Sequence, residues 1–226
     1  MGSDDLFKTR KARKKDDLAR QSRHRAAYTR FLIVCEGTKT EPYYLQELIN
    51  DLGIRHHTVK VARNDGTSPD RIVAHDVKLY DEDALGGDSF DKVFCVFDRD
   101  THETFDAAVQ RINDLNGAKE PKLYEAITST PCFEYWLLLH FGYTNKPFHA
   151  AVKRSVGDQV VAELKTKPGF SKYGKGQEQT YSMLKAKTAK AVTHSQRVRK
   201  HAEKTGQANP LTYVDVLVDA LQALVK

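Results

Sequence analysis

The chain has 226 residues, of which 40% are hydrophobic and 29% charged, and its formal net charge is +6. This composition is typical of a globular protein, and the length is enough to bury a core without disulfides or a structural metal. No apolar run approaches the roughly 18–20 residues that span a bilayer, and the charged N-terminus lacks the apolar core of a signal peptide. We therefore expect a cytoplasmic protein that does not act at a membrane.

The three cysteines also exclude two classes of protein. Their odd number and the lack of C-x-x-C spacing argue against a disulfide framework and against a structural zinc site. Cys35 and Cys95 lie inside apolar runs, so we expect them to be buried core thiols.

The charge is unevenly distributed along the chain. Residues 1–30 hold ten Lys or Arg and four Asp, and residues 165–204 hold eleven basic and two acidic residues. Residues 70–125, by contrast, hold fourteen acidic and seven basic residues. This pattern favours an acidic metal site bordered by surfaces that attract polyanions. The alternative is a solvated basic tail and a solvated helix face.

Helices and strands are expected to alternate from residue 31 onward. Residues 1–29 are polar and basic, and we expect a flexible tail there. In chain order the pattern predicts a strand at 31–35, a helix that Thr40 can cap, a strand at 56–63, a helix from Ser68 to about 82, a strand at 92–97, a helix ending near 116, a strand at 123–128 and a helix at about 132–141. This alternation predicts an α/β fold with a mostly parallel central sheet and helices on both faces.

Only helical signals follow residue 142, with helices expected at about 178–204 and 212–225. The chain is therefore divided into a tail at 1–29, an α/β domain at 30–142 and a helical C-terminal part at 143–226. That last part is expected either as an appended subdomain or as extra helices on the same sheet.

Carboxylates stand at the ends of two apolar strands. Glu36 follows the first strand directly, and Asp98 and Asp100 follow the strand at 92–97. The carboxyl ends of parallel strands share one edge of the sheet, where open α/β folds bind ligands. Three converging carboxylates would suit a hard divalent cation such as Mg²⁺. The alternatives are a solvated glutamate that caps a helix and a polar turn before the next helix.

Two further acids are candidates for a second cation. Glu41 lies about one helical turn beyond Glu36, but beside Pro42 it also fits an ordinary first-turn acid. Glu134 follows the strand at 123–128 and could be a metal ligand or simply an acid at a helix start. Two-metal nucleases use such acids to stabilise both the attacking and the leaving oxygen.

Basic residues of the C-terminal part are candidates for contacts to a nucleic-acid backbone. The predicted set is Lys172, Lys175, Lys185, Lys187, Lys190, Arg197, Arg199 and Lys200.

Four segments resemble the RloB family of bacterial phage-defence proteins. They are residues 31–44 (FLIVCEGTKTEPYY), 93–100 (VFCVFDRD), 129–141 (STPCFEYWLLLHF) and 209–213 (NPLTY), together with the basic tail. A Glu-Gly pair after the first strand and an Asp-x-Asp pair after a later one also resemble the Toprim fold of topoisomerases, primases and OLD-family nucleases.

The resemblance implies a Toprim nuclease-like effector that depends on Mg²⁺ or Mn²⁺. It further implies a partner ATPase of the ABC/AAA type and a role in antiviral defence by abortive infection. Glu36 then matches the Toprim glutamate, Asp98 and Asp100 the paired aspartates, and Glu134 the acid of the family's Phe-Glu block. The spacing to Glu41 departs by one residue from the OLD nucleases, which puts a two-metal mechanism in doubt.

The leading hypothesis is a metal-dependent nuclease in which Asp98 and Asp100 hold the cation and Glu36 is a further ligand or the general base. The substrate could be RNA, such as tRNA, or DNA. A catalytically silent Toprim module that serves the ATPase as a sensor or docking partner is the second hypothesis. A phosphatase or nucleotidyl-transfer enzyme acting on small phosphates is the third. The sequence leaves a homo-oligomer open.

Overall fold

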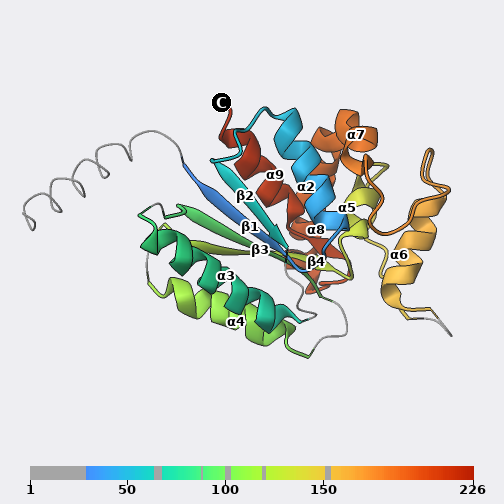
Figure 1. Ribbon diagram of the computed structural model, residues 1–226. Coiled ribbons are helices and arrows are strands. Elements are labelled where there is room, and N and C mark those ends of the chain that lie inside the picture. The colour runs from blue at the N-terminus through green and yellow to red at the C-terminus, as the bar shows by residue number, and fades with distance from the viewer. Residues whose placement is uncertain (1–28, 64–67, 88, 100–102, 119–120, 151–153) are drawn as a thin grey trace, which may run out of the picture.

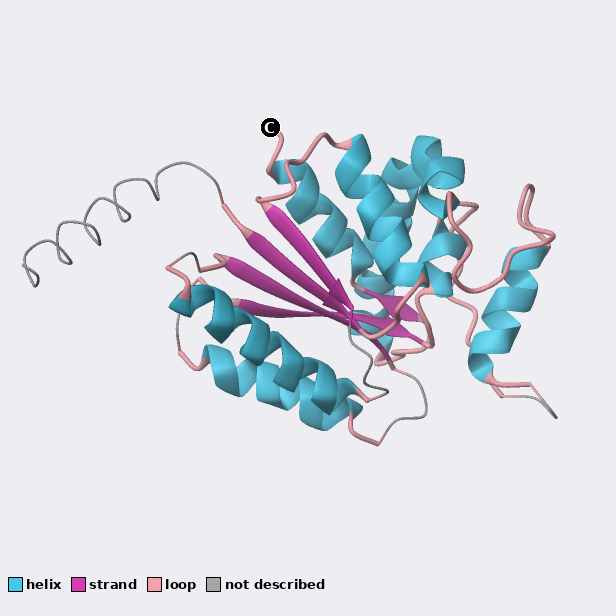
Figure 2. Cartoon of the chain, in the orientation of Figure 1, coloured by secondary structure: helices cyan, strands magenta, loops and turns pink. Residues whose placement is uncertain are grey.

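A computed structural model of the chain describes residues 29–63, 68–87, 89–99, 103–118, 121–150 and 154–226. In this part of the chain, a central sheet lies between two layers of helices (Figure 1). Figure 2 separates the magenta strands from the cyan helices on either side of them. The predicted α/β fold class is therefore confirmed, and the arrangement is consistent with a Toprim-like fold.

The sheet of the described residues has the strand order β2-β1-β3-β4-β5. All neighbouring pairs are parallel except the last, in which β5 runs antiparallel to β4. The strands are β1 (Phe31–Cys35), β2 (Val59–Arg63), β3 (Lys92–Asp98), β4 (Tyr124–Thr130) and β5 (Leu211–Thr212). The carboxyl ends of β1, β3 and β4 consequently meet at one edge of the sheet.

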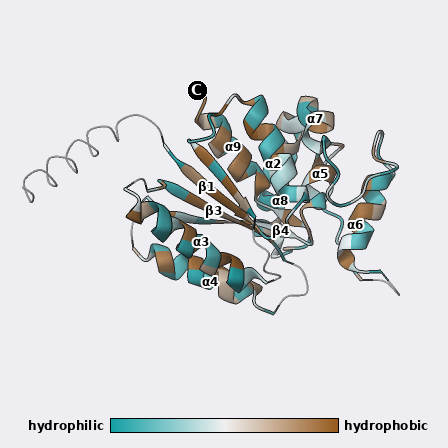
Figure 3. Cartoon of the chain, viewed as in Figure 1, coloured by the Kyte–Doolittle hydropathy of each residue, from teal (hydrophilic) through white to brown (hydrophobic). Residues whose placement is uncertain are grey.

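Two apolar clusters, one on each face, account for the continuous apolar runs of the central strands. Ile33 of β1 and Phe94 of β3 belong to one cluster, whereas Leu32 and Val93 belong to the other. This alternation follows from the period of two residues in a strand. A strand covered on both faces needs apolar residues at every position, as seen in parallel sheets. Figure 3 shows the resulting brown, apolar character of β1 and β3.

Helices α3 and α4 cover one face of the sheet, and the remaining helices gather on the other (Figure 1). Their bounds are α2 (Thr40–Asp51), α3 (Pro69–Leu85), α4 (Phe105–Asn116), α5 (Glu134–Leu139), α6 (Val156–Lys165), α7 (Thr180–Leu184), α8 (Thr188–Thr205) and α9 (Val214–Ala223). Helices before and after residue 142 contribute to the same apolar cluster, since α2 and α5 share it with α8 and α9.

The C-terminal third differs from the sequence-based expectation in two places. Leu211 and Thr212 form the short strand β5 at the edge of the sheet, where only helical structure was expected. The single helix expected at 178–204 is divided into α7, a 3-10 turn at Lys185–Lys187 and α8. The division has a packing reason, because α7 contacts α2 whereas α8 contacts α5.

Earlier elements agree with the prediction apart from their ends. The strand expected from residue 56 begins at Val59, and the helix expected to end near residue 82 continues to Leu85. Cys35 and Cys95 are buried, as predicted. Among the described residues, no helix combines the length and apolar character that crossing a membrane requires.

Candidate functional site

The carboxyl ends of β1 and β3 bring Glu36 and Asp98 into direct contact. The backbone N–H of Glu36 donates to the Val96 carbonyl at 2.9 Å, which extends the ladder between the two strands. The backbone N–H of Asp98 then donates to Oε2 of Glu36 at 3.0 Å. The parallel register places both residues at the edge of the sheet, because Cys35 pairs with Val96. Two residues separated by 62 positions in sequence thus share one hydrogen bond.

The first turn of α2 adds Glu41 to this edge, and Gly37 makes the space for it. A Cβ atom at residue 37 would lie 2.2 Å from Oε2 of Glu41, which is closer than two such atoms can approach. A side chain at residue 37 would therefore displace the Glu41 carboxylate from its present position. Gly37 does not have a positive φ, so a left-handed backbone conformation is not the reason for this glycine.

Glu134 begins α5 and is almost completely buried, with 2% of its surface exposed. The Tyr173 hydroxyl donates to its Oε1 at 3.3 Å, and Nζ of Lys175 lies 3.8 Å from its Oε2. A buried carboxylate needs such partners, because an unpaired charge in the interior is unfavourable. Glu134 is therefore held in place by a segment almost forty residues further along the chain.

The four acids Glu36, Glu41, Asp98 and Glu134 form one electrostatic unit, which we call the acidic cluster. Burial raises the pKa of Glu41 to about 7, and repulsion from Glu134 and Glu36 adds to this effect. Burial also raises the pKa of Asp98 well above its usual range, with further contributions from Glu41, Glu134 and Glu36. Like charges in a desolvated site disfavour ionisation of each other. The cluster therefore has an excess of negative charge that a cation would relieve.

Lys175 supplies positive charge to the acidic cluster. Burial favours its neutral form, yet attraction to Glu134 and then Asp98 and Glu41 outweighs burial and raises the Lys175 pKa. Its side chain is still 60% exposed, so the ammonium group can also reach a ligand from solvent.

The loop that holds Lys175, residues 171–177, is docked on the start of α2. The backbone N–H of Gly176 donates to Oγ1 of Thr40 at 2.8 Å. Thr40 was expected to cap α2, but the helix begins at this residue and its side chain binds the loop instead. Gly176 has a φ of +79°, and a Cβ atom there would lie 2.9 Å from the Cβ of Lys39. The backbone of the loop therefore needs glycine at this point.

The donor chemistry of the acidic cluster fits a hard cation, since it consists of carboxylate oxygens. The charge also fits, because the pKa values of Asp98 and Glu41 are both raised. The described residues nevertheless contain no group of three or more His, Cys, Asp or Glu side chains positioned to hold a metal ion. Asp100, the third acid of the sequence-based set, lies outside the described residues.

The predicted basic contact residues differ in their surroundings. Lys172, Lys190 and Lys200 are exposed. Lys185 forms an ion pair with Asp51, while Lys187 lies over the Phe141 ring and Arg197 over the Tyr143 ring. Surface cations of this kind remain able to meet a polyanion, since stacking on an aromatic ring leaves the charge in place.

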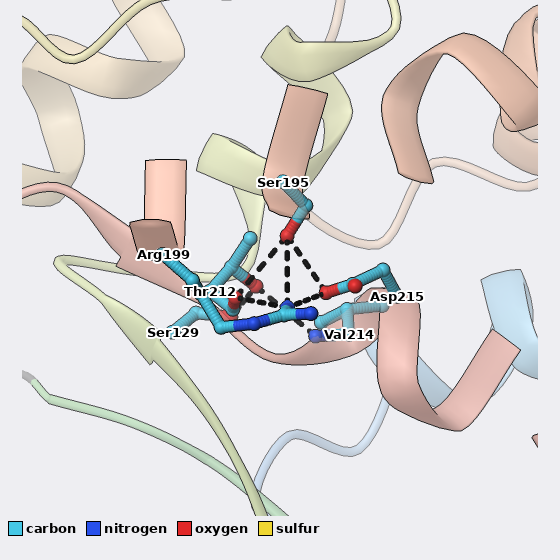
Figure 4. Close-up of polar contacts among 6 residues, drawn as sticks. All are labelled: Ser129, Ser195, Arg199, Thr212, Val214 and Asp215. Atoms are coloured by element: carbon cyan, nitrogen blue, oxygen red, sulfur yellow. Dashed lines mark hydrogen bonds and ion pairs between the residues drawn. The ribbon is translucent and has the colours of Figure 1, made fainter. Parts of the chain in front are cut away.

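Arg199 is the exception in the basic set. Its guanidinium group forms an ion pair with Asp215, which is fully buried, and also donates to the Thr212 carbonyl at 3.4 Å (Figure 4). Ser195 donates to the same Asp215 carboxylate at 2.7 Å. These contacts give Arg199 a structural role.

Sequence reasoning identified the acids but not the partners that position them. Tyr173 was not among the expected site residues, and the contact between Thr40 and Gly176 was not expected. Lys175 was expected only to contact a nucleic-acid backbone. The available signal was the run Ser171 to Gly176, whose two glycines and two lysines indicated a flexible basic loop. Nothing in that run specifies which distant helix it contacts.

Comparison with known proteins agrees with the sequence-based resemblance. A family model described as RloB-like protein matches residues 31–221, which include all four acids of the acidic cluster. No curated protein and no solved structure matches the chain. The family match covers most of the 226 residues. The chain therefore belongs to the RloB-like family.

Proposed function

We propose that this protein is a nuclease that depends on Mg²⁺ or Mn²⁺ and cleaves phosphodiester bonds in RNA, such as tRNA, or in DNA. The observation that carries the proposal is the meeting of Glu36 and Asp98 at the carboxyl edge of the sheet. Acids on separate strands are brought together there although burial and repulsion raise the pKa of Asp98. Such perturbed groups in close proximity are typical of functional sites.

In this proposal Asp98 and Asp100 hold the cation, with Glu36 as a further ligand or as the general base. Glu134 and Glu41 are candidates for additional ligands. A bound divalent cation would activate water and neutralise charge on the reacting phosphate. In this proposal Lys175 contacts a phosphate oxygen. Support comes from its partly exposed side chain, which lies beside Glu134, and from its pKa, which the acidic cluster raises.

The direct test is the substitution Asp98→Asn, assayed on tRNA, on single strands and on duplexes with Mg²⁺ or Mn²⁺. Asp114→Asn is the matched control, since Asp114 is an exposed aspartate on α4 outside the acidic cluster. We expect Asp98→Asn to lower the cleavage rate at least about a hundredfold, as loss of a group that stabilises the transition state does, while Asp114→Asn cuts like wild type. An Asp98→Asn protein that cuts at the wild-type rate contradicts the proposal.

A catalytically silent module is the second candidate, and one observation favours it. Both oxygens of Glu134 already have partners within the chain, Tyr173 and Lys175. A carboxylate held in this way can serve stability alone. Absence of cleavage with both metals, with and without the partner ATPase, would support this second function and exclude the first.

The proposed biological setting is antiviral defence by abortive infection, with an ATPase of the ABC/AAA type as partner. Support for this setting comes from the resemblance to the RloB family and not from the geometry of the site. Expression of the protein with a candidate partner ATPase of this type should protect cells against phage, and Asp98→Asn should remove the protection. Equal protection by the Asp98→Asn variant would show that the defence role does not depend on the acidic cluster.

A further inference from the structure

A cavity of about 410 Å³ opens on the face of the sheet opposite the acidic cluster, beside the carboxyl half of β4. Thr128 and Thr130 form its floor, Arg99 stands at one side and Tyr213 at the other. This volume lies within the range of about 300–1,000 Å³ that small-molecule sites occupy. The cavity is not part of the proposed metal site, yet Arg99 is the residue that follows Asp98.

Hydrogen bonds to β4 fix both sides of the cavity. The backbone N–H of Arg99 donates to the Ser129 carbonyl at 2.7 Å, and the backbone N–H of Tyr213 donates to the Thr128 carbonyl at 2.9 Å. Arg99 and Tyr213 are therefore each anchored to β4, by two consecutive carbonyl groups of that strand. The backbone of the sheet therefore fixes the positions of Arg99 and Tyr213, and side chains of α4 complete the lining.

Two aromatic rings of the lining, those of Tyr213 and Phe105, each pack against an arginine. The guanidinium group of Arg199 lies 5.3 Å from the Tyr213 ring centre, and Arg199 is itself anchored on buried Asp215. On the other side, Arg99 lies over the Phe105 ring at 4.9 Å. Tyr213 keeps 37% of its surface exposed, so part of the ring can still receive a ligand. A held, partly exposed ring is a stacking platform.

The described residues of the lining carry no net charge. Arg99 and Asp106 are the charged side chains among them, and they form an ion pair at 3.4 Å. Gln110 and the threonine hydroxyls add neutral polar groups, while Val109 and Leu211 are apolar. A phosphate would find no excess positive charge here. The lining instead suits a flat, neutral group that carries hydrogen-bond donors and acceptors along its edge, as nucleobases do.

We propose that this cavity binds one unstacked base of the nucleic acid whose backbone is cleaved at the acidic cluster, an inference that rests on the proposed nuclease function. Asp98 pairs with Ser129 of β4 in the sheet. Thr128 and Thr130 of the cavity floor are the residues on either side of Ser129 in β4. Successive residues of a strand direct their side chains to opposite faces. A strand of nucleic acid that crosses the sheet edge at Asp98 would therefore present its phosphate to one face and a neighbouring base to the other.

The test uses fluorescein-labelled single-stranded RNA and DNA, each in a series with one abasic position moved along the strand. Binding is measured by anisotropy in EDTA, so that no cleavage takes place. Val109→Trp fills the cavity from α4, and Ala107→Trp, which adds the same side chain to an exposed position of α4, is its control. Tyr213→Ala removes the stacking ring and gives a second variant, should Val109→Trp fail to fold.

We expect one abasic position to weaken wild-type binding about tenfold, which is the scale of base stacking on an aromatic ring. In Val109→Trp and Tyr213→Ala, the intact strand should bind about tenfold more weakly, and the same abasic position should have no further effect. The salt dependence of binding should not change, because no phosphate contact is lost. Ala107→Trp should behave like wild type.

The outcomes separate the two proposals. A wild-type protein that binds every abasic strand equally, or variants that keep the position-dependent loss, would overturn the base-binding inference and leave the nuclease proposal intact. Position-dependent binding without cleavage in Mg²⁺ or Mn²⁺ would support the cavity and reject the nuclease. Absence of binding to both RNA and DNA would contradict both.

Discussion

Asp215 is a fully buried carboxylate, so its partners must come from within the chain. Arg199 provides the opposite charge and Ser195 a hydrogen bond at 2.7 Å (Figure 4). When one partner of a buried ion pair is removed, the remaining charge has neither water nor counter-ion. The pair links α8 to the start of α9 and lies next to β5, so its loss should affect the whole C-terminal packing.

We predict that Arg199→Met lowers the free energy of unfolding by about 3–5 kcal/mol. Lys200→Met is the control, because Lys200 is the exposed neighbour on α8, and it should change stability by no more than about 0.5 kcal/mol. Replacing both partners, with Arg199→Met and Asp215→Leu together, should recover much of the loss. Urea denaturation measures all three, and equal stability of the two single variants would disprove the structural role of Arg199.

His140 is a second buried residue whose protonation matters, and its tautomer follows from its partners. Nδ1 lies 3.0 Å from the Trp136 carbonyl, which can only accept, so Nδ1 carries the proton. Nε2 then accepts from the Tyr44 hydroxyl at 3.4 Å. Burial lowers the pKa of His140 to about 4, with smaller contributions from Lys187 of the 3-10 turn and His194 of α8. The folded protein therefore favours the neutral form of the His140 ring.

The pH dependence follows from this shift. The folded pKa lies below the ordinary value near 6.5, so the unfolded chain binds a proton first and the folded state loses stability as the pH falls from about 6.5 to about 4. Between pH 7 and pH 5 the loss should be about 2 kcal/mol. His140→Gln, which cannot titrate, should lack this component. Parallel urea curves at both pH values test it, and an equal pH-dependent loss in wild type and variant would contradict the assignment.

At the scale of elements, the loop at 171–177 positions Lys175 and Tyr173 beside Glu134. Its contact with α2 depends on Gly176, because a side chain there would meet Lys39 and the residue has a positive φ. Gly174 is the natural comparison, since a Cβ atom at that residue would meet nothing within 4 Å. The two glycines lie in the same loop but have different surroundings.

We predict that Gly176→Ala lowers the free energy of unfolding by about 1–3 kcal/mol and reduces metal-dependent cleavage, because Lys175 and Tyr173 move away from Glu134. Gly174→Ala should leave both quantities near the wild-type values. Thermal unfolding and initial cleavage rates give the comparison. If the two variants behaved alike, the docked loop would not contribute to the site.

The sequence specified the central elements because their signals are local. The buried strands at Phe31–Cys35 and Lys92–Asp98 are continuous apolar runs, and the helix after Ser68 carries a proline at its first position. Strand β5 has no such signal, since it consists of two residues and exists only through pairing with β4. The docking of Gly176 on Thr40 is likewise a long-range contact between polar and small residues, which no periodicity can indicate.

At the scale of the whole molecule, charge is separated between an acidic cluster and basic residues of the C-terminal part. The exposed Lys172, Lys190 and Lys200 are the members of the predicted basic set that have the most freedom to meet a phosphate backbone. The acids could be predicted because they follow strands, and parallel strands end at a common edge. The positions of the lysines on the folded surface could not, because they depend on how the helices after residue 142 pack.

We predict that binding to nucleic acid weakens steeply with salt, because each phosphate contact releases counter-ions. Lys190→Gln should weaken binding about equally for all sequences and reduce the slope of log affinity against log salt by about one. Lys78→Gln is the control, since Lys78 belongs to α3 on the other face of the sheet. Anisotropy titrations across a salt series provide the slopes. If the affinity of the wild type did not depend on salt concentration, the basic residues would not be the contact to nucleic acid.

Anomalous diffraction from crystals soaked in Mn²⁺ shows whether acids from separate strand ends share a cation. We expect a manganese peak within coordination distance of the Asp98 carboxylate and of at least one oxygen of Glu36, Glu41 or Glu134. The peak should disappear in Asp98→Asn crystals soaked under the same conditions. A manganese ion bound elsewhere, with the acidic cluster unchanged in the presence of the metal, would exclude a shared cation at these acids.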